Sequence, residues 1–215
     1  MKYGILTLLV LGVLSGCSND KDPSEANFKK AAQANLDAEG PECYFLSYFP
    51  IETEQSNQEL QNKLQVLEKA GVLTVNAQAK IQIPSLFDKS REKVAPGYEL
   101  TEEGKKYYKE NVAHSFAAGQ LGGLCFGKSE IVEITNFSEP ENAGGQRIAK
   151  VKYTYKISGL PEWAKRPEVY NAFDQDKMNV QNLKAAVESE KKPIKASAAF
   201  ILTNKGWMHS KQFRK

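Results

Sequence analysis

Residues 147–157 place the strongest constraint on how this chain can fold. From residue 149 onward every second side chain is apolar: Ala149, Val151, Tyr153, Tyr155 and Ile157. The positions between them are polar: Lys150, Lys152, Thr154 and Lys156. Because successive side chains of a strand point to opposite faces of a sheet, this alternation predicts a half-buried strand. A sheet with one covered and one solvated face is typical of antiparallel pairing.

Neighbouring segments predict further strands of such a sheet. Residues 130–137 form a β-rich run, and apolar residues alternate again over residues 194–202. The sequence Asn142-Ala143-Gly144-Gly145 is a turn signal. Residues 207–213 follow another turn and are expected to form a short last strand.

Helices are expected between these strands, at residues 161–173 and at residues 180–187, where Asn179 is the expected cap. Strands in a mainly antiparallel sheet with inserted helices define an α+β fold class. We assign this part to residues 113–215.

The preceding half begins with a predicted helix. Ser24 is expected to cap it, and the helix is expected to run to about Asp37 before Gly40 and Pro41 stop it. Its apolar side chains recur every four residues along one side: Phe28, Ala32 and Leu36. Residues 43–49 are aromatic and apolar, which predicts a buried strand.

A second helix is expected to begin after Thr53 or Ser56 and to end at Ala70, where Gly71 is a natural cap. Short strands are expected at residues 72–75 and 80–83. The polar residues 88–93 read as an exposed loop, and Thr101 is expected to cap a helix that reaches Tyr108.

The segment Leu64-x-x-Leu67-Glu68-Lys69-Ala70-Gly71-Val72-Leu73, a charged tip, and then Tyr98-x-Leu100-Thr101-x-x-Gly104 resembles the end of a winged-helix domain. The resemblance covers residues 54–111 and implies a helix, a two-stranded wing and a closing helix. We therefore expect residues 25–112 to form a small helical, winged-helix-like part that packs on the antiparallel part.

Most winged helices bind DNA, but this sequence departs from that pattern. Its groove-facing helix would carry three glutamates, Glu54, Glu59 and Glu68, against only two lysines, Lys63 and Lys69. The whole chain has 29 Lys and Arg against 26 Asp and Glu, a net charge of +3. DNA binding needs a concentrated basic face. We expect no nucleic-acid partner and interpret the unit as a protein-contact module.

The first 16 residues have the composition of a secretory signal. Lys2 supplies a positive charge, and the segment from Gly4 to Val13 is almost wholly apolar. This run is too short to span a bilayer, which takes about 20 apolar residues. Residues 1–16 are therefore expected to be removed on export.

The end of the signal, Leu14-Ser15-Gly16-Cys17, resembles the lipobox of bacterial lipoproteins. The resemblance implies cleavage before Cys17, a diacylglyceryl group on its thiol and acylation of the new N-terminus. Ser18 follows the cysteine, which points to the outer membrane of a Gram-negative cell rather than to the inner one. Residues 17–24 are then expected to be a short polar tether. An ordinary cleaved signal followed by an unmodified cysteine is the alternative.

Two cysteines remain, Cys43 and Cys125. In an oxidising, exported compartment such a pair favours a disulfide, which would close a loop of roughly 80 residues and add about 4–5 kcal/mol in the chain-entropy model. A catalytic thiol at Cys125, with its pKa lowered by Lys128, is the competing interpretation.

Motifs for other chemistry are weak. Gly122-x-x-x-x-Gly127-Lys128-Ser129 matches the letters of a phosphate-binding loop, but a strand rather than a helix is expected after it. His114 and His209 stand alone, and the sequence contains no Gly-x-Ser-x-Gly. We expect no cofactor, no nucleotide, no metal and no catalytic residues.

Partner contacts have two candidate sources. Lys150, Lys152 and Lys156 form a row on one strand face, which is either a docking surface for an acidic partner or an anionic glycan, or a solvated face with lysines that protect a sheet edge. Trp163, between two prolines, and Trp207, after a turn, are candidate interface anchors. Core packing is the alternative for each tryptophan.

These observations together predict a lipoprotein on the periplasmic side of the outer membrane that acts as a protein-binding or envelope-assembly module. An immunity or inhibitor lipoprotein is one alternative, and a cryptic envelope hydrolase whose site forms only in space is another.

Overall fold

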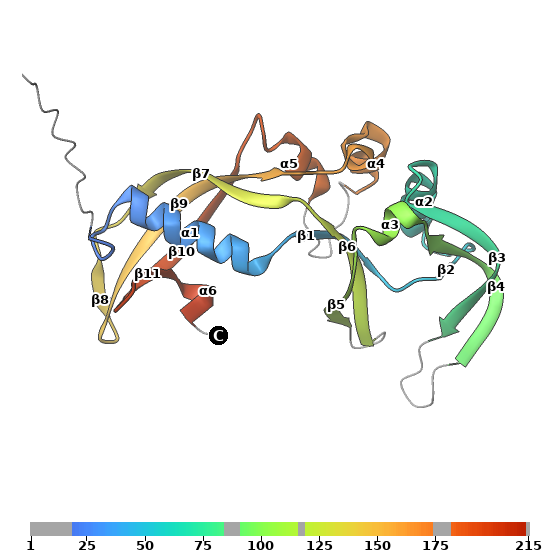
Figure 1. The fold of residues 1–215 in the computed structure, drawn as a ribbon, viewed down its shortest axis with the longest axis horizontal. Helices are drawn as coiled ribbons and strands as arrows, with labels where there is room; N and C mark the ends of the chain where they lie inside the picture. The colour runs from blue at the N-terminus through green and yellow to red at the C-terminus, as the bar shows by residue number, and fades with distance from the viewer. Residues whose placement is uncertain (1–18, 84–90, 116–118, 174–181, 214–215) are drawn as a thin grey trace, which may run out of the picture.

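A computed structural model of the chain describes residues 19–83, 91–115, 119–173 and 182–213 (Figure 1). Within these ranges the fold is α+β, with three antiparallel sheets and short helices, as the sequence predicted in outline. The elements run in the order α1 (Glu25–Glu39), β1 (Glu42–Ser47), β2 (Ile51–Glu52), α2 (Gln58–Lys69), β3 (Leu73–Ile83), β4 (Arg91–Leu100), α3 (Glu102–Lys105), β5 (Tyr108–Ser115), β6 (Gly119–Phe126), β7 (Lys128–Phe137), β8 (Glu141–Ala143), β9 (Gln146–Ser158), η1 (Glu162–Lys165), α4 (Pro167–Ala172), α5 (Leu183–Glu188), β10 (Ile194–Thr203), β11 (Gly206–His209) and α6 (Ser210–Phe213).

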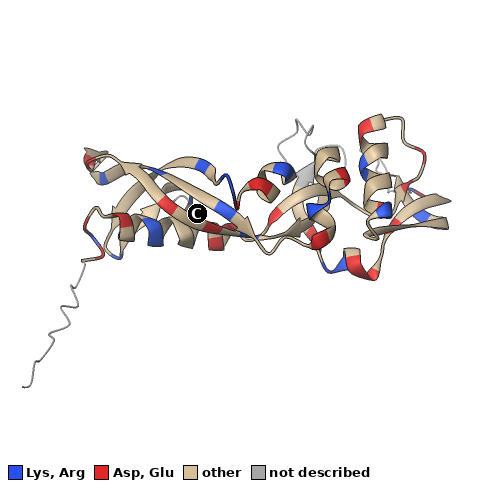
Figure 2. Cartoon of the chain, turned by 90° about the horizontal axis from the view of Figure 1, so that it is seen from above, with Lys and Arg blue, Asp and Glu red and all other residues tan. Residues whose placement is uncertain are grey.

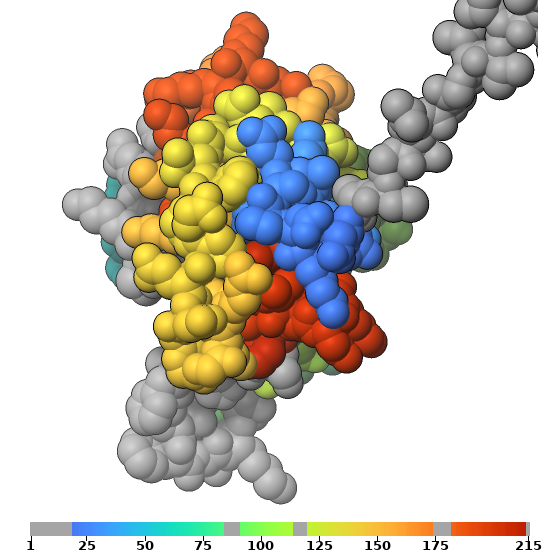
Figure 3. Space-filling model, turned by 90° about the vertical axis from the view of Figure 1, so that its left-hand side faces the viewer, coloured from blue at the N-terminus to red at the C-terminus, as the bar shows by residue number. Residues whose placement is uncertain are grey.

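The largest sheet has the strand order β11-β10-β9-β7, with β8 paired to β9, and it curls around α1. Seen from the end, α1 lies between the β8–β9 hairpin and the C-terminal strands (Figure 3). Ser24 caps α1, as predicted, by accepting a hydrogen bond from the backbone N–H of Asn27 at 3.3 Å. The predicted apolar side of α1, which includes Phe28 and Leu36, is buried against this sheet.

The predicted alternation of β9 is confirmed from Ala149 to Tyr153 but fails at Thr154, which is buried although it was expected on the solvated face. Ala149 and Val151 are fully buried, whereas Lys150 and Lys152 between them are exposed. The turn at Gly144 and Gly145 is also confirmed, because both residues have positive φ angles in the β8–β9 hairpin.

A second sheet, in the order β1-β6-β5, lies between the large sheet and the far end of the molecule (Figure 1). Cys43 of β1 and Cys125 of β6 face each other in this ladder and form the predicted disulfide, with an S–S distance of 2.05 Å. The disulfide therefore ties an early strand to one that follows 82 residues later.

The third sheet, in the order β2-β4-β3, forms the far end together with α2 (Figure 1). Here the sequence predictions need three corrections. Asn57 caps α2 instead of Thr53 or Ser56, with its side chain accepting from the N–H groups of Glu59 and Leu60. The two short strands predicted at residues 72–83 are a single strand, β3, with an irregularity in register after Asn76.

The third correction concerns the exposed loop predicted at residues 88–93. Residues 91–93 are the start of β4 and pair with β3, for example Arg91 with Ile83, while residues 88–90 lie outside the described residues. Charged side chains favour an exposed loop in a sequence, but they are equally compatible with a strand whose faces are both open to solvent. The helix capped by Thr101 is the single turn α3, and Tyr108 already begins β5.

The spatial grouping of elements differs from the expected order along the chain. Helix α1 packs on β7 and β11, and β1 pairs with β6, so early segments belong with late ones. The expected boundary between residues 112 and 113 falls inside β5. At the C-terminus, β11 is followed by the short helix α6, so the strand predicted at residues 207–213 ends at His209. Helix α5 is capped by Asn182, and the expected cap Asn179 lies outside the described residues.

Candidate functional site

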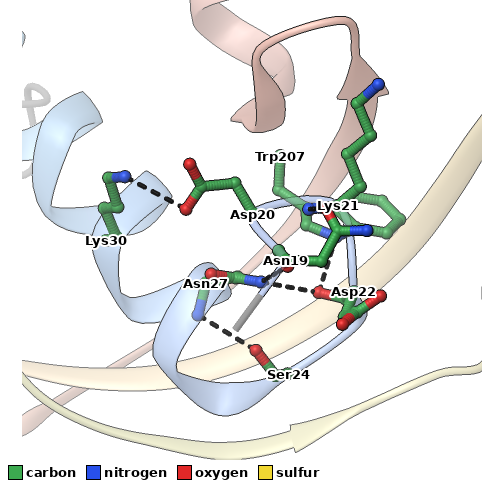
Figure 4. A network of polar contacts seen from close by, with 8 residues as sticks. All are labelled: Asn19, Asp20, Lys21, Asp22, Ser24, Asn27, Lys30 and Trp207. Carbon is green, nitrogen blue, oxygen red and sulfur yellow. Dashed lines mark hydrogen bonds and ion pairs between the residues drawn. The ribbon is translucent and has the colours of Figure 1, made fainter. Parts of the chain in front are cut away.

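The first described residues, 19–24, are fastened to the folded body (Figure 4). The side-chain amide of Asn27 donates hydrogen bonds to the carbonyl oxygens of Asn19 and Asp22, both at 2.9 Å. The indole N–H of Trp207 donates to the same Asp22 carbonyl at 3.1 Å, from the other end of the chain. We call residues 19–22 and these partners the N-terminal clasp.

The burial of Asn27 and the close packing at Gly206 fix the geometry of the clasp. Asn27 is 7% exposed in the first turn of α1, so its amide needs the partners it finds. Gly206 has a φ of +101°, and a Cβ atom there would lie 2.8 Å from the carbonyl oxygen of Asp20. Only glycine allows the turn before β11 to approach the clasp this closely. An exposed ion pair of Lys30 with Asp20, at 3.3 Å, adds a weaker contact.

The clasp corrects the expected tether. Residues 19–24 belong to the folded body, and Cys17 and Ser18 lie outside the described residues. Cys17 is two residue steps from Asn19, and an extended chain spans at most about 3.6 Å per residue, so the two lie within roughly 7 Å. A lipid on Cys17 would therefore hold this end of the body close to a bilayer.

The disulfide organises a second site. Glu42 and Tyr44 flank Cys43 on β1, at an irregularity in the register between Cys43 and Phe45. Both line a cavity of about 170 Å³. The rest of the lining comes from β9, β10 and the first turns of α5: Ile157, Ile194, Asn182, Ala185 and Ala186. The covalent bond at Cys43 thus fixes the strand that carries two of the polar residues of the cavity wall, and Asn182 is the third.

The carboxyl group of Glu42 has an unusually high pKa for a glutamate. Burial raises the pKa of Glu42 to about 7, and the nearby charge of Glu39 raises it as well. A hydrogen bond with Ser129 and the charge of Lys211 lower the pKa of Glu42, but less strongly. Burial and the charge of Glu42 raise the pKa of Tyr44 above its usual value. The carboxyl group is therefore held in surroundings that favour its neutral form.

Two polar atoms of the residues that line this cavity have no hydrogen-bond partner within the described part of the chain. They are Oε2 of Glu42 and the hydroxyl oxygen of Tyr44, and both are inaccessible to solvent. Tyr44 as a whole is only 2% exposed. Buried polar groups are nearly always hydrogen-bonded in native proteins, so such a pair requires an explanation.

The lysine row predicted on β9 exists, but not at an edge. Strand β9 lies between β10 and β7, so its lysines cannot protect a sheet edge. Lys150 and Lys152 are exposed on the face opposite α1, whereas Lys156 pairs with Glu190 at 3.1 Å. Acidic residues of β7 stand across the ladder, including Glu130 opposite Lys156. Charges of both signs are interspersed along the molecule (Figure 2).

Trp163 lies in the core. It is 5% exposed, and its ring packs edge-on against Tyr107 and Phe126, with centroids 5.6 and 5.0 Å away. Its burial matches the core-packing alternative, and its side chain offers almost no surface to a partner.

The remaining motifs are separated in the fold. Gly127 turns the chain with a φ of +81°, and strand β7 begins at Lys128, so the phosphate-loop letters lie on a strand, a turn and a strand. His114 lies on β5, whereas His209 lies on β11 of another sheet, buried, with its pKa lowered by burial. Over the residues that the structure covers, no group of three or more His, Cys, Asp or Glu side chains could hold a metal ion.

Sequence reasoning found the disulfide but missed the groups around it. The sequence did hold one local sign of the cavity. Glu42 is a charged residue beside a bridging cysteine, at the start of an aromatic and apolar strand. Nothing local marked Asn27 or Trp207 as clasp residues. No described helix is long and apolar enough to cross a membrane. Comparisons with protein-family models, curated proteins and solved structures found no significant match.

Proposed function

We propose that this protein is a lipoprotein, held through Cys17 on the periplasmic face of the outer membrane, and that it acts as a protein-binding or envelope-assembly module. The observation that supports this most is the clasp. It joins the folded body to a point two residues from the cysteine that the lipobox marks for lipidation. The disulfide is consistent with an exported, oxidising compartment.

The clasp also gives the anchored molecule a direction. Residues 19–24 lie at one end of the long axis and the β3–β4 hairpin at the other (Figure 1). With little chain between lipid and body, the anchored end stays at the bilayer and the hairpin projects away from it. A module joined to its lipid by so short a linker reaches partners at a defined distance from the membrane.

Within this proposal, the winged-helix-like unit over residues 54–111 is the contact module. The hairpin exposes three large apolar side chains, Val75, Ile83 and Val94, which are 44%, 40% and 64% exposed. Strand β3 is also at the edge of its sheet, where backbone groups can pair with an added strand. On α2, Lys63 is buried and paired with Glu59 at 2.7 Å, which removes one of the two lysines that a DNA-reading helix would use.

The test has two stages. The mature protein from its native host should carry the mass of an N-terminal Cys17 with acyl chains, and a mature mass without them would overturn the anchoring. Crosslinking pull-downs from native envelopes should then recover one stoichiometric partner, which is lost with Cys17→Ala.

A matched pair of surface variants localises the contact. Val94→Lys on the hairpin should release the partner, whereas Val132→Lys, at a 37% exposed valine on β7, should retain it. Retention by both variants, or an empty pull-down with the lipidated protein, would contradict the contact role of the hairpin. Asn27→Ala should keep the lipid but loosen residues 19–22, which faster amide hydrogen exchange would report.

A further inference from the structure

Two hydrophobic cores meet in the middle of the molecule. One lies under α1 and includes Phe28, and the other lies among β1, β6, α2, α4 and α5 and includes Trp163. The chain crosses between them at Gly40, Gly127 and Gly159, all with positive φ angles. Gly127 and Gly159 adjoin paired residues of β7 and β9, and Gly40 lies two residues before the β1 residue that pairs with β6 next to Gly127. We call this level of the molecule the junction.

Packing at the junction is tight at one point and loose at another. A Cβ atom on Gly127 would lie 2.6 Å from Cγ2 of Ile157, so the chain at Gly127 lies directly against β9. Ile157 also lines the cavity of about 170 Å³, whose walls come from β1 and α5 of one core and from β9 and β10 of the large sheet. Walls that face a void lose the dispersion contacts that would hold them together. The junction can therefore pivot at Gly127 and open at the cavity.

A hydrogen bond and an ion pair join the end of α5 to β9 across the junction. The N–H of Ile157 donates to the buried hydroxyl of Ser189 at 2.8 Å. Beside it, Lys156 pairs with Glu190 at 3.1 Å, with both side chains partly exposed. The amide of Ile157 is protected from hydrogen exchange by a contact that opening would break, so it reports on the junction.

Glu42 carries an unsolvated carboxyl oxygen at this level. Its Oε2 atom is inaccessible to solvent and has no hydrogen-bond partner within the described part of the chain. Burial is the main reason why the pKa of Glu42 is about 7. An ionised carboxylate needs water or donors around its oxygens, which the closed junction withholds from this atom.

The groups around Glu42 do not replace that water. They come from each element packed near it: Glu39 of α1, Ser129 of β7, Lys211 of α6, Tyr155 of β9 and Tyr44 of β1 itself. The charge of Glu39 adds to the effect of burial on the pKa of Glu42. Lys211 and Ser129 act the other way but less strongly, and Lys211 is already paired with Glu39 at 2.9 Å.

We propose that the junction is a hinge controlled by one proton: it is closed while Glu42 is neutral, and ionisation of Glu42 opens it to water at the cavity. Because Cys43 is bridged to Cys125, β1 moves together with β6. Opening changes the direction of the β3–β4 hairpin relative to α1 and the N-terminal clasp, which lie towards the other end of the molecule (Figure 1). This inference is independent of lipid anchoring and of any protein partner.

The pH range follows from the two states of Glu42. Its pKa is about 7 in the closed junction and returns toward the ordinary 4.5 in the open one. The closed state is therefore fully favoured below pH 4.5, weakens as the pH rises to 7 and changes little above that. Between pH 5 and pH 8 the ratio of open to closed molecules should rise by roughly 10- to 70-fold, the higher figure applying if opening fully hydrates Glu42.

The test measures a distance across the junction. In the purified full chain with Cys17→Ser and the native disulfide intact, spin labels are placed on the exposed positions Lys69→Cys of α2 and Lys152→Cys of β9. Pulsed electron paramagnetic resonance should show one distance population at pH 5 and a second, growing population up to pH 8. The amide of Ile157 should exchange faster over the same range after correction for its intrinsic rate.

Two matched variants assign the effect to one carboxyl group. Glu42→Gln keeps the shape of the side chain but cannot ionise, so it should show the pH 5 distance at both pH values. The control is Glu190→Gln, which removes the carboxylate of the ion pair across the same junction, and it should keep the pH response. Far-ultraviolet circular dichroism checks that each variant is folded.

Three outcomes would overturn the proposal. They are a distance that does not change with pH, a pH response that survives in folded Glu42→Gln, and a pH response lost in folded Glu190→Gln. Carbon-13 NMR of the Glu42 carboxyl group separates the first case further, since a raised pKa with a constant distance would show a rigid junction. Because no envelope partner is present, failure here leaves the proposed envelope role standing, and loss of the envelope partner leaves the hinge standing.

Discussion

The sheet that covers α1 and the outer half of the β3–β4 hairpin are both antiparallel, yet they are stabilised in different ways. On the large sheet, Phe28 of α1 and Phe200 of β10 are fully buried against each other. In the hairpin beyond residue 79, Ala79 and Ile81 are buried, while Val94 is 64% exposed. A helix covers the first sheet, whereas the outer hairpin is stabilised mainly by strand pairing and has only exposed ion pairs on its faces.

The ion pairs of the hairpin do not make up the difference. Lys93 and Glu52 approach to 2.6 Å, and Lys80 and Glu92 to 3.8 Å, all with partly exposed side chains. Such pairs contribute about 0–1 kcal/mol each. Apolar burial contributes about 25 cal/mol per Å², so the region under α1 should dominate the stability of the chain. One end of the molecule is therefore stabilised by apolar burial under a helix, whereas the other leaves apolar side chains exposed.

The largest effect is expected from the disulfide between these two regions. Replacing both cysteines, with Cys43→Ser and Cys125→Ser, removes a crosslink over 82 residues and should cost about 4.5 kcal/mol of the free energy of unfolding. Urea unfolding of the oxidised protein and the double variant measures this loss. The protein treated with reductant is the control and should match the variant. A loss below about 1 kcal/mol would show that β1 and β6 stay paired in the middle sheet without help from the crosslink.

The next effect tests the core under α1. The ring of Phe28 lies 5.0 Å from that of Phe137 and 4.9 Å from that of Trp207, and Phe28→Ala should cost about 4 kcal/mol through lost burial and a cavity. Thermal unfolding by calorimetry provides the measurement. A loss under about 1.5 kcal/mol would mean that the helix is not the main cover of this sheet.

A smaller effect, expected from Glu42→Gln at high pH, is an increase rather than a loss in the free energy of unfolding. The pKa of Glu42 is raised to about 7 in the folded protein from its ordinary value of 4.5, so the folded state binds the proton more tightly than the unfolded state. The stability from this group is present below pH 4.5 and is lost as the pH rises through 7. Glu42→Gln should therefore stabilise the protein by about 2 kcal/mol at pH 8, after allowance for solvent screening.

The same variant should have almost no effect on stability at pH 4, where the native carboxyl group is neutral. Urea midpoints at both pH values measure the difference. Equal effects of Glu42→Gln at the two pH values would show that the pKa of Glu42 is not raised in the folded protein.

The smallest effect is expected on the hairpin. Val94→Thr keeps β-branching at an exposed position of β4, and it should change the free energy of unfolding by less than about 0.5 kcal/mol. A thermal scan beside Phe28→Ala measures the contrast directly. A loss above about 1.5 kcal/mol would place Val94 in a packed core and remove the difference between the two regions.

The sequence predicted the parts of this fold that depend on neighbouring residues. The Ser24 cap, the turn at Gly144 and Gly145 and the alternation along β9 as far as Tyr153 appear as expected, whereas Thr154 is buried. The predicted pairing of Cys43 with Cys125 rested on compartment and on count rather than on spacing. The start of β4 at Arg91 was missed, because its charged side chains resemble a loop until β3 is seen beside them.

The functional features required contacts between distant residues. Trp207 reaches Asp22 across most of the chain, and nothing in either local sequence indicates the hydrogen bond. Trp163 could be assigned to a surface or to a core from its sequence, and only the rings of Tyr107 and Phe126 around it decide for the core.

Local sequence was enough for the Ser24 cap, for the buried face of β9 up to Tyr153 and for the Gly144–Gly145 turn, since these follow from side chains within a few residues. The clasp at residues 19–22 and the cavity lined by Glu42 and Tyr44 depend on contacts between distant parts of the chain. The physical reason is desolvation: whether a polar group loses water and finds a partner depends on what the rest of the chain brings to it.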